Sequence, residues 1–271
     1  MGDYVCLLLL SEPACLRQQI FSRHLMTHKT KGIVLRTIKY GETSVVVNIF
    51  TELFGVQTYM VNGVRAPKKM YASAGYFQPG AILALVVYHN DQKSMQRIKE
   101  FSWDYLYQNV LSDVIKNSIA LYMIELLQKC LKQPEQNSNL FYFCEEVLKQ
   151  LDTAGKRVAA NFALYFALQL THFLGFKMNH AYTAQNHILD LQEGNFVTEQ
   201  PTHPYFIYGE NALLTSQLLK VMQPYELENF KLHHNTRREL LLSYQDYYAL
   251  HITDFGQMKT LTVLREVLSE A

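Results

Sequence analysis

The 271-residue sequence has no long apolar run. A helix that crosses a bilayer needs about 20 consecutive apolar residues, and no stretch approaches that length, so no transmembrane helix is expected. The short apolar run at residues 5–10 follows Asp3 and no basic residue, whereas a secretory signal peptide begins with positive charge. The sequence therefore predicts a protein without a membrane span or a signal peptide.

Cysteine is scarce and irregularly placed. The four cysteines, Cys6, Cys15, Cys130 and Cys144, form no C-x-x-C pair and lack the spacing of a disulfide framework. A reducing compartment fits this usage best, so we expect a cytoplasmic protein. Cys130 and Cys144 lie in apolar helical stretches and are interpreted as small buried hydrophobic residues.

The signatures of common catalytic sites are also missing. The chain contains no nucleophile elbow, no Walker phosphate loop and no dinucleotide-binding glycine fingerprint. Glu125 and the pair Glu145-Glu146 are the nearest acid/base candidates, but a solvated helix face explains them more simply. Because no convergent set of titratable groups is visible, the sequence predicts a protein that is not an enzyme.

Histidine is the residue type here that most invites a metal hypothesis. Ten are present, among them His180, His187 and His203 and the pair His233-His234. Zinc ligands usually come in close pairs such as C-x-x-C or H-x-x-x-H, and this part of the chain has no cysteine. We therefore expect no metal and no other cofactor.

Charge is balanced over the whole chain but divided unevenly along it. The formal net charge is +1. Residues 26–100 carry ten basic and four acidic side chains, a net of +6, and residues 101–271 carry a net of −5. Such an asymmetry favours contact between the basic part and a nucleic acid or another anionic surface.

Periodicity divides the chain into two parts. Strand-like alternation, with β-branched and aromatic runs between turn residues, predicts five strands at residues 31–39, 44–51, 56–61, 81–88 and 95–101. Five short strands with one long connection between the third and fourth are typical of an OB-type barrel, which removes exposed sheet edges. An SH3-like barrel is the main competitor.

Apolar spacing of three and four residues takes over after Trp103 and predicts an all-α domain. Asp152-Thr153 is a candidate N-terminal cap for the third helix, and Gly175 a candidate C-terminal one. A polar segment at residues 176–209 with weak β patterning interrupts the array. The expected class is α+β, with domains at residues 26–102 and 103–271, and with helices at 110–131, 139–151, 156–174, 211–222, 237–255 and 259–268.

Basic side chains cluster beside turns of the predicted barrel. Arg36 and Lys39 flank the first turn, and Arg65, Lys68 and Lys69 crowd the loop after the third strand. In OB barrels such cations pair with phosphates, and exposed aromatic residues such as Tyr40 and Tyr59 could stack on bases. The competing interpretation is that the cations form a solvated rim and Tyr59 packs inside the barrel.

Several turn and loop residues together carry a family resemblance. In the barrel these are Gly32-Ile-Val-Leu-Arg36, Tyr40-Gly41-Glu42, Phe50-Thr51-Glu52, Gly55 and Gly63-Val-Arg65-Ala-Pro67-Lys68. In the helical part they are Thr171-His-Phe-Leu174-Gly175-Phe176 and Leu191-Gln-Glu-Gly194-Asn-Phe196. From about Thr27 to its end, the sequence resembles the bacterial recombination mediator RecO family.

The resemblance implies a DNA repair and recombination mediator. Such a protein binds single- and double-stranded DNA, anneals complementary strands, and with RecR promotes loading of RecA onto DNA coated with single-strand-binding protein. Binding would be led by charge and largely independent of sequence. The resemblance places the DNA-binding residues at Lys31, Arg36, Lys39, Arg65, Lys68 and Lys69.

The family also docks the acidic C-terminal tail of single-strand-binding protein on its helical domain. A tail of this kind needs an apolar pocket with one or two cations. The sequence offers several candidates and does not choose among Lys116, Lys129, Lys132, Lys156 and Arg157.

The sequence departs from the family in one segment. Many members hold zinc with four cysteines after the Leu-Gly-aromatic helix end, but residues 177–206 contain none. We expect a metal-free version in which Phe196, Tyr205 and apolar neighbours hold the segment together. We also expect Met26 to be the natural start and residues 1–25 to be a non-native or disordered extension.

One alternative from another functional class stays open. The protein could be an interaction adaptor whose barrel binds a peptide or a subunit and no nucleic acid. The basic loop separates the two hypotheses, because charge reversal at Arg65, Lys68 and Lys69 should abolish DNA binding and leave adaptor activity intact.

Overall fold

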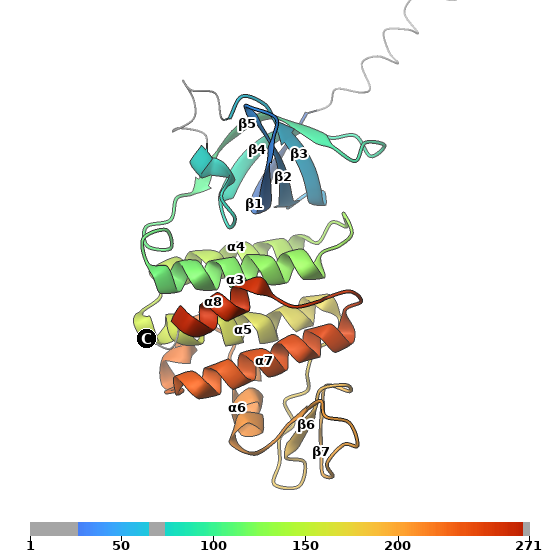
Figure 1. Ribbon diagram of the computed structural model, residues 1–271, viewed down its shortest axis with the longest axis vertical. Helices are drawn as coiled ribbons and strands as arrows, with labels where there is room; N and C mark the ends of the chain where they lie inside the picture. Colours follow the sequence, from blue (N-terminus) through green and yellow to red (C-terminus); the bar gives the residue numbers. More distant parts are fainter. Residues whose placement is uncertain (1–26, 65–73, 268–271) are drawn as a thin grey trace, which may run out of the picture.

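The computed structural model describes residues 27–64 and 74–267 and shows a β-barrel stacked on a layered set of helices (Figure 1). The strands form a closed barrel in the order β1-β2-β3-β5-β4. A parallel pairing of β3 with β5 closes a barrel that is otherwise antiparallel. The elements are β1 (Thr27–Tyr40), β2 (Ser44–Thr51), β3 (Gly55–Val61), the 3-10 helix η1 (Ala74–Phe77), β4 (Ile82–Tyr88) and β5 (Gln96–Tyr105).

The five predicted strands and the OB-type barrel are confirmed, with the last strand running four residues further than expected. Alternation explains the barrel interior, because successive strand residues point to opposite faces. On β2, Val45, Val47 and Ile49 are buried in the barrel core, and the residues between them are partly exposed. The prediction that Met26 is the natural start, and that residues 1–25 are an extension, lies outside the described residues.

β1 is buried on both of its faces in its central part. Val34 belongs to the barrel core. Its neighbours Ile33 and Leu35 belong to the apolar cluster of the helical domain, together with Phe50 and Ile82. The Phe50 ring meets the Phe141 ring edge-on, with centroids 5.5 Å apart. Outward-facing residues of the barrel therefore complete the core of the helical domain, beside a separate core inside the barrel.

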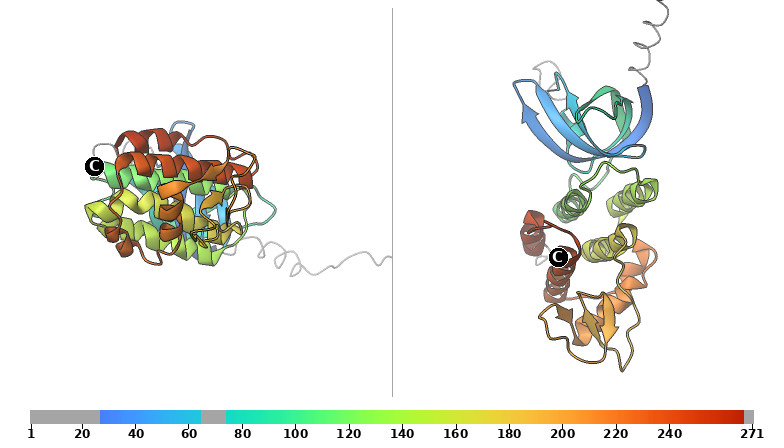
Figure 2. Two further views of the ribbon diagram at one scale, coloured as in Figure 1. Left: turned by 90° about the horizontal axis from the view of Figure 1, so that it is seen from below. Right: turned by 90° about the vertical axis from the view of Figure 1, so that its right-hand side faces the viewer.

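The helices lie in layers below the barrel (Figures 1 and 2). α3 and α4 contact the barrel, α5, α7 and α8 form the next layer, and α6 lies toward the far end with a small sheet. The expected helices are all present, with shifted ends for several. Their bounds are α3 (Val114–Cys130), α4 (Ser138–Thr153), α5 (Lys156–Leu174), α6 (Gly209–Leu219), the 3-10 helix η2 (Pro224–Asn229), α7 (His234–His251) and α8 (Lys259–Val267).

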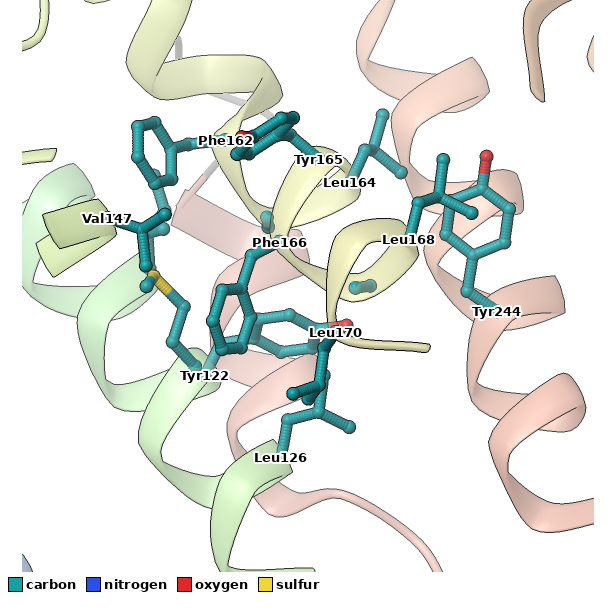
Figure 3. Close-up of a cluster of buried hydrophobic side chains, with 14 of the residues drawn as sticks. Tyr122, Leu126, Val147, Phe162, Leu164, Tyr165, Phe166, Leu168, Leu170 and Tyr244 are labelled. Carbon is teal, nitrogen blue, oxygen red and sulfur yellow. The ribbon is translucent and has the colours of Figure 1, made fainter. Parts of the chain in front are cut away.

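α5 is the central helix of this domain. Thirteen of its 19 residues are buried, so it is apolar on nearly every side. Figure 3 shows Phe162, Tyr165 and Phe166 of α5 packed among side chains of α3, α4 and α7. Gly175 ends the helix in the left-handed conformation at φ 83°, which confirms the predicted C-terminal cap. Within the described part of the chain, no helix is long and apolar enough to span a bilayer.

The predicted N-terminal cap of α5 is wrong. Asp152 and Thr153 are the last turn of α4, and the N-cap of α5 is Gly155, which has no side chain to accept a hydrogen bond. Asp152 instead faces the link between the domains. Its carboxylate accepts the Tyr105 hydroxyl at 3.0 Å and the backbone N–H groups of Gln108, Asn109 and Val110 at 2.8 to 2.9 Å.

The segment after α5 forms a three-stranded sheet in the order β7-β6-β8, from β6 (Ile188–Asp190), β7 (Asn195–Val197) and β8 (Phe206–Ile207). Phe196 is buried and meets the Tyr182 ring edge-on, as expected. The Tyr205 ring is 39% exposed, and the residue joins the segment through its backbone, whose carbonyl accepts from the Leu191 N–H at 3.0 Å. Tyr247 of α7 also anchors the segment, because its hydroxyl donates to the Phe176 carbonyl at 2.6 Å.

No group of three or more metal-ligating side chains occurs among residues 27–64 and 74–267.

Candidate nucleic-acid interface

The outer surface of β1, β2, β3 and β5 is the part of the barrel that faces away from its core. The strand register sets its residues in rows. Arg36 pairs with Asn48, which pairs with Thr58, and in the next row Val46 lies between Ile38 and Met60. Met60 then pairs with Arg97 of β5. We call this surface the outer face, composed of Arg36, Ile38, Tyr40, Ser44, Val46, Asn48, Thr58, Met60 and Arg97.

A β-bulge between Val34 and Arg36 turns the Arg36 side chain onto the outer face. The extra residue of a bulge shifts the alternation of a strand by one. As a result Ile33, Val34 and Leu35 are all buried, whereas Arg36 is exposed. The irregularity therefore separates the part of β1 that packs from the part that faces solvent.

The outer face carries cations and no carboxylate. Arg36 and Arg97 lie within it, and the exposed Lys39 and Lys93 flank it. In the described part of the chain, no carboxylate lies within ion-pair distance of these four side chains. Unpaired, solvated cations beside apolar and aromatic surface are what a sequence-independent contact with a polyanion requires.

The predicted residues have different locations. Arg36 and Lys39 lie on the exposed half of β1, and Tyr40 is 54% exposed. Tyr59 lies inside the barrel with 0% exposure, so the expectation that it stacks on bases is wrong. Its burial raises the pKa of the Tyr59 hydroxyl. Arg65, Lys68 and Lys69 lie outside the described residues, and their role stays a prediction.

Lys31 has partners that the sequence did not predict. Its ammonium lies 2.8 Å from a Glu145 carboxylate oxygen and 3.2 Å from one of Asp104. Lys149 approaches the same Glu145 oxygen at 2.6 Å. The hydrogen bond to Glu145 raises the pKa of Lys31 above its usual value, against the effect of burial. Lys31 therefore lies in an ion-pair network between the barrel and α4, and not beside Arg36 and Lys39.

Two cations escaped the sequence analysis. Lys93 lies in the turn between β4 and β5, and Arg97 is the second residue of β5. The available signal was their position around a turn, because the loop between the fourth and fifth strands of an OB barrel commonly contacts ligands. The parallel pairing that brings Arg97 beside Met60 joins residues far apart in the sequence and leaves no local signal.

The five candidate cations of the helical domain differ in how accessible they are. Lys116 is buried, and its ammonium donates to the Asp152 carbonyl at 2.7 Å. Lys129 and Lys132 donate to the carbonyls of Phe255 and Thr253. Arg157 lies 3.1 Å from Glu228 and is exposed, as is its neighbour Lys156. The solvated pair at the start of α5 is thus the more accessible of these candidates.

Comparison with known proteins gives matches along nearly the whole chain. The family model described as "Recombination protein O N terminal" matches residues 26–106, and "Recombination protein O C terminal" matches residues 111–260. The two matches divide where the barrel passes into α3.

Whole-length relatives agree with these matches. The DNA repair protein RecO of Azobacteroides pseudotrichonymphae is 30% identical over 89% of this chain and 99% of its own length. Those of Phocaeicola vulgatus and Flavobacterium psychrophilum are 31% and 32% identical, each over 90% of this chain and 100% of its own length. The chain therefore belongs to the RecO family of DNA repair proteins.

Proposed function

We propose that this protein is a recombination mediator that binds single- and double-stranded DNA through its barrel. In this role it anneals complementary strands and, with RecR, promotes the loading of RecA onto DNA coated with single-strand-binding protein. The observation that carries the proposal is the outer face, where Arg36 and Arg97 have no carboxylate within ion-pair distance among the residues that the structure describes. Membership of the RecO family supports it.

The chemistry of the outer face favours contact with the phosphate backbone. Each arginine or lysine that neutralises a phosphate releases a counterion, so affinity falls steeply as salt rises. The apolar side chains of Ile38 and Met60 lie in the same row as Arg97, and the exposed ring of Tyr40 follows Lys39 at the end of β1. They offer contacts to bases that do not depend on base identity. Such a surface suits annealing, which must accept any sequence.

The protein partners belong to the same proposal. RecR and the acidic tail of single-strand-binding protein would contact this chain directly, and RecA would be affected only through the DNA. Lys156 and Arg157 are the cations that we assign to the acidic tail, because both are exposed at the start of α5.

Fluorescence anisotropy of a labelled single-stranded oligonucleotide, measured from low to moderate salt, tests the DNA contact. The Arg36→Glu, Lys39→Glu double variant should bind at least about 100-fold more weakly than the unmodified protein, since two phosphate contacts become repulsions. Lys177→Glu with Lys220→Glu is the matched control, because both lysines are exposed in the half of the molecule farther from the barrel.

Equal losses in the two double variants would show that net charge, and not the outer face, governs binding. The absence of DNA binding by the unmodified protein would contradict the proposal and favour the adaptor hypothesis.

A further inference from the structure

A groove of about 860 Å³ lies where the barrel meets the helical domain. One wall is the end of the outer face, formed by residues of β2 and β3. The loop between β4 and β5 forms a second wall. The loop between α3 and α4 forms the third and contributes Leu131, Lys132, Pro134 and Gln136. The groove is therefore built from both domains.

The groove continues the outer face. Asn48 and Thr58 belong to the face and also line the groove. A second hollow of about 550 Å³ shares His89, Lys93 and Gln96 with the groove and reaches Arg97. A chain lying on the outer face could thus enter the groove without crossing a barrier of side chains.

Amide side chains dominate the polar part of the lining. Asn48, Gln57, Gln92 and Gln136 come from all three walls. Some of these groups already have partners, since the Gln57 and Gln136 amides donate to the Phe54 and Glu52 carbonyls and the Asn48 oxygen accepts from the Thr58 hydroxyl. The Gln92 amide and the remaining donors and acceptors can still pair with the hydrogen-bonding edges of any base. The Phe54 ring, stacked on His89 with centroids 3.8 Å apart, adds flat apolar surface.

The charges of the groove match an anionic occupant. Lys93 and Lys132 line it. The acidic residue of its lining, Asp91, has its carboxylate 2.8 Å from the His89 ring. Glu135 belongs to the α3–α4 loop but is not part of the lining. A polyanion with exposed hydrogen-bonding edges fits this combination better than a peptide or an apolar ligand.

The walls are held in place before any ligand binds. The Gln96 side chain donates to the carbonyls of Asn90 and Lys93 and accepts from the Asn90 N–H, which fixes the β4–β5 loop. On the other side the backbone of Glu135 packs directly on Gly55, where a Cβ would lie only 2.1 Å from the Glu135 oxygen. Preorganised walls reduce the entropy lost on binding.

We propose that this groove receives unpaired bases of single-stranded DNA, so that the α3–α4 loop of the helical domain contacts the strand. The proposal rests on the proposed function and sharpens it. The Watson–Crick edges of the bases are already paired in a duplex, so the amides of the groove can reach those edges only in a single strand. Duplex DNA contacts the outer face alone, whereas a single strand uses the face and the groove.

The test compares affinities for single- and double-stranded oligonucleotides of equal length. Gln92→Glu with Gln136→Glu keeps the side-chain shapes and places two negative charges in the groove. It should weaken single-strand binding about tenfold and duplex binding less than about twofold, because only the strand enters the groove. Gln185→Glu with Gln192→Glu, both exposed far from the barrel, is the matched control and should change neither.

A neutral pair, Gln92→Ala with Gln136→Ala, separates lost contacts from added repulsion. It should still weaken single-strand binding about threefold, since each amide loses hydrogen bonds to bases. Both residues are exposed, so the variants should keep the melting temperature of the unmodified protein. Parallel losses for both DNA forms, or no loss for either, overturn the groove while the proposed function stands. Failure of the unmodified protein to bind any DNA overturns both.

Discussion

β1 contains two basic stretches that face different surroundings. Lys31 lies at the end next to the helices and is surrounded by Glu145 and Asp104. Arg36 and Lys39 lie past the bulge, exposed and without a carboxylate partner within the described residues. The three are similar side chains on a single strand. Packing against the helical domain, and not the charge itself, decides which cations remain available to a ligand.

The largest change in stability should come from replacing Asp152, which connects α4 to the segment between the barrel and α3. Replacing it with alanine leaves three backbone N–H groups and the Tyr105 hydroxyl without their acceptor. Buried donors without a partner cost about 1 to 3 kcal/mol each, so the free energy of unfolding should fall by about 3 to 5 kcal/mol. Urea denaturation measures it, with the exposed Asp91→Ala as control. A loss below about 1 kcal/mol would show that the link holds without this carboxylate.

A second prediction sets Lys31 against Lys39. Lys31→Met should lower the free energy of unfolding by about 1 to 2 kcal/mol, because it leaves the buried Glu145 with one partner. It should leave DNA affinity nearly unchanged. Lys39→Met should do the reverse and weaken DNA binding about threefold to tenfold. If Lys31→Met weakened DNA binding as much as Lys39→Met, the division of the strand would be wrong.

Low pH should weaken the contacts between the barrel and the helical domain, because these contacts depend on ionised carboxylates. Burial raises the pKa of Glu145 and Asp152, but hydrogen bonds from Lys149 and Lys31 and from the linker N–H groups lower both below their ordinary values of 4.5 and 3.8. A carboxyl group with a lowered folded pKa stabilises the fold above its ordinary pKa and loses that contribution as pH falls.

The free energy of unfolding should therefore decline as pH drops below about 5. The Asp152→Asn variant should show a shallower decline in urea titrations at a series of pH values. Identical slopes in the two proteins would remove Asp152 from this explanation.

The smallest effect should be that of Arg97 alone. Arg97→Gln removes the one cation that β5 contributes to the outer face as defined above. The slope of the logarithm of affinity against the logarithm of salt concentration should fall by about 1, as expected for one phosphate contact. Lys99→Gln is the control, because Lys99 already lies 3.5 Å from Glu100. An unchanged slope for Arg97→Gln would show that Arg97 makes no phosphate contact.

Local patterns predicted the fold well. The five strands follow from alternation, and α5 has the predicted bounds, because its apolar residues continue until Gly175. Alternation also indicates the observed location of Tyr59, which favours the competing interpretation that it packs inside the barrel. It shares its strand face with the buried Val61, so strict periodicity places it inside the barrel.

The cap assigned to Asp152 and the surroundings of Lys31 depend on contacts between residues far apart in the sequence. Asp152 resembles a helix cap by spacing, but α4 extends through it and its acceptors are needed by the linker. Lys31 and Glu145 are 114 residues apart, and only the packed structure brings them together.

The double burial of β1 has a consequence for cooperativity. A fragment that ended with β5 would expose Ile33, Leu35, Phe50 and Ile82, which the intact protein buries against the helices. Exposed apolar patches of this kind promote aggregation. Because the two domains complete each other's interior, heating should unfold them in one transition, and their separate contributions are better measured by point substitutions than by cutting the chain.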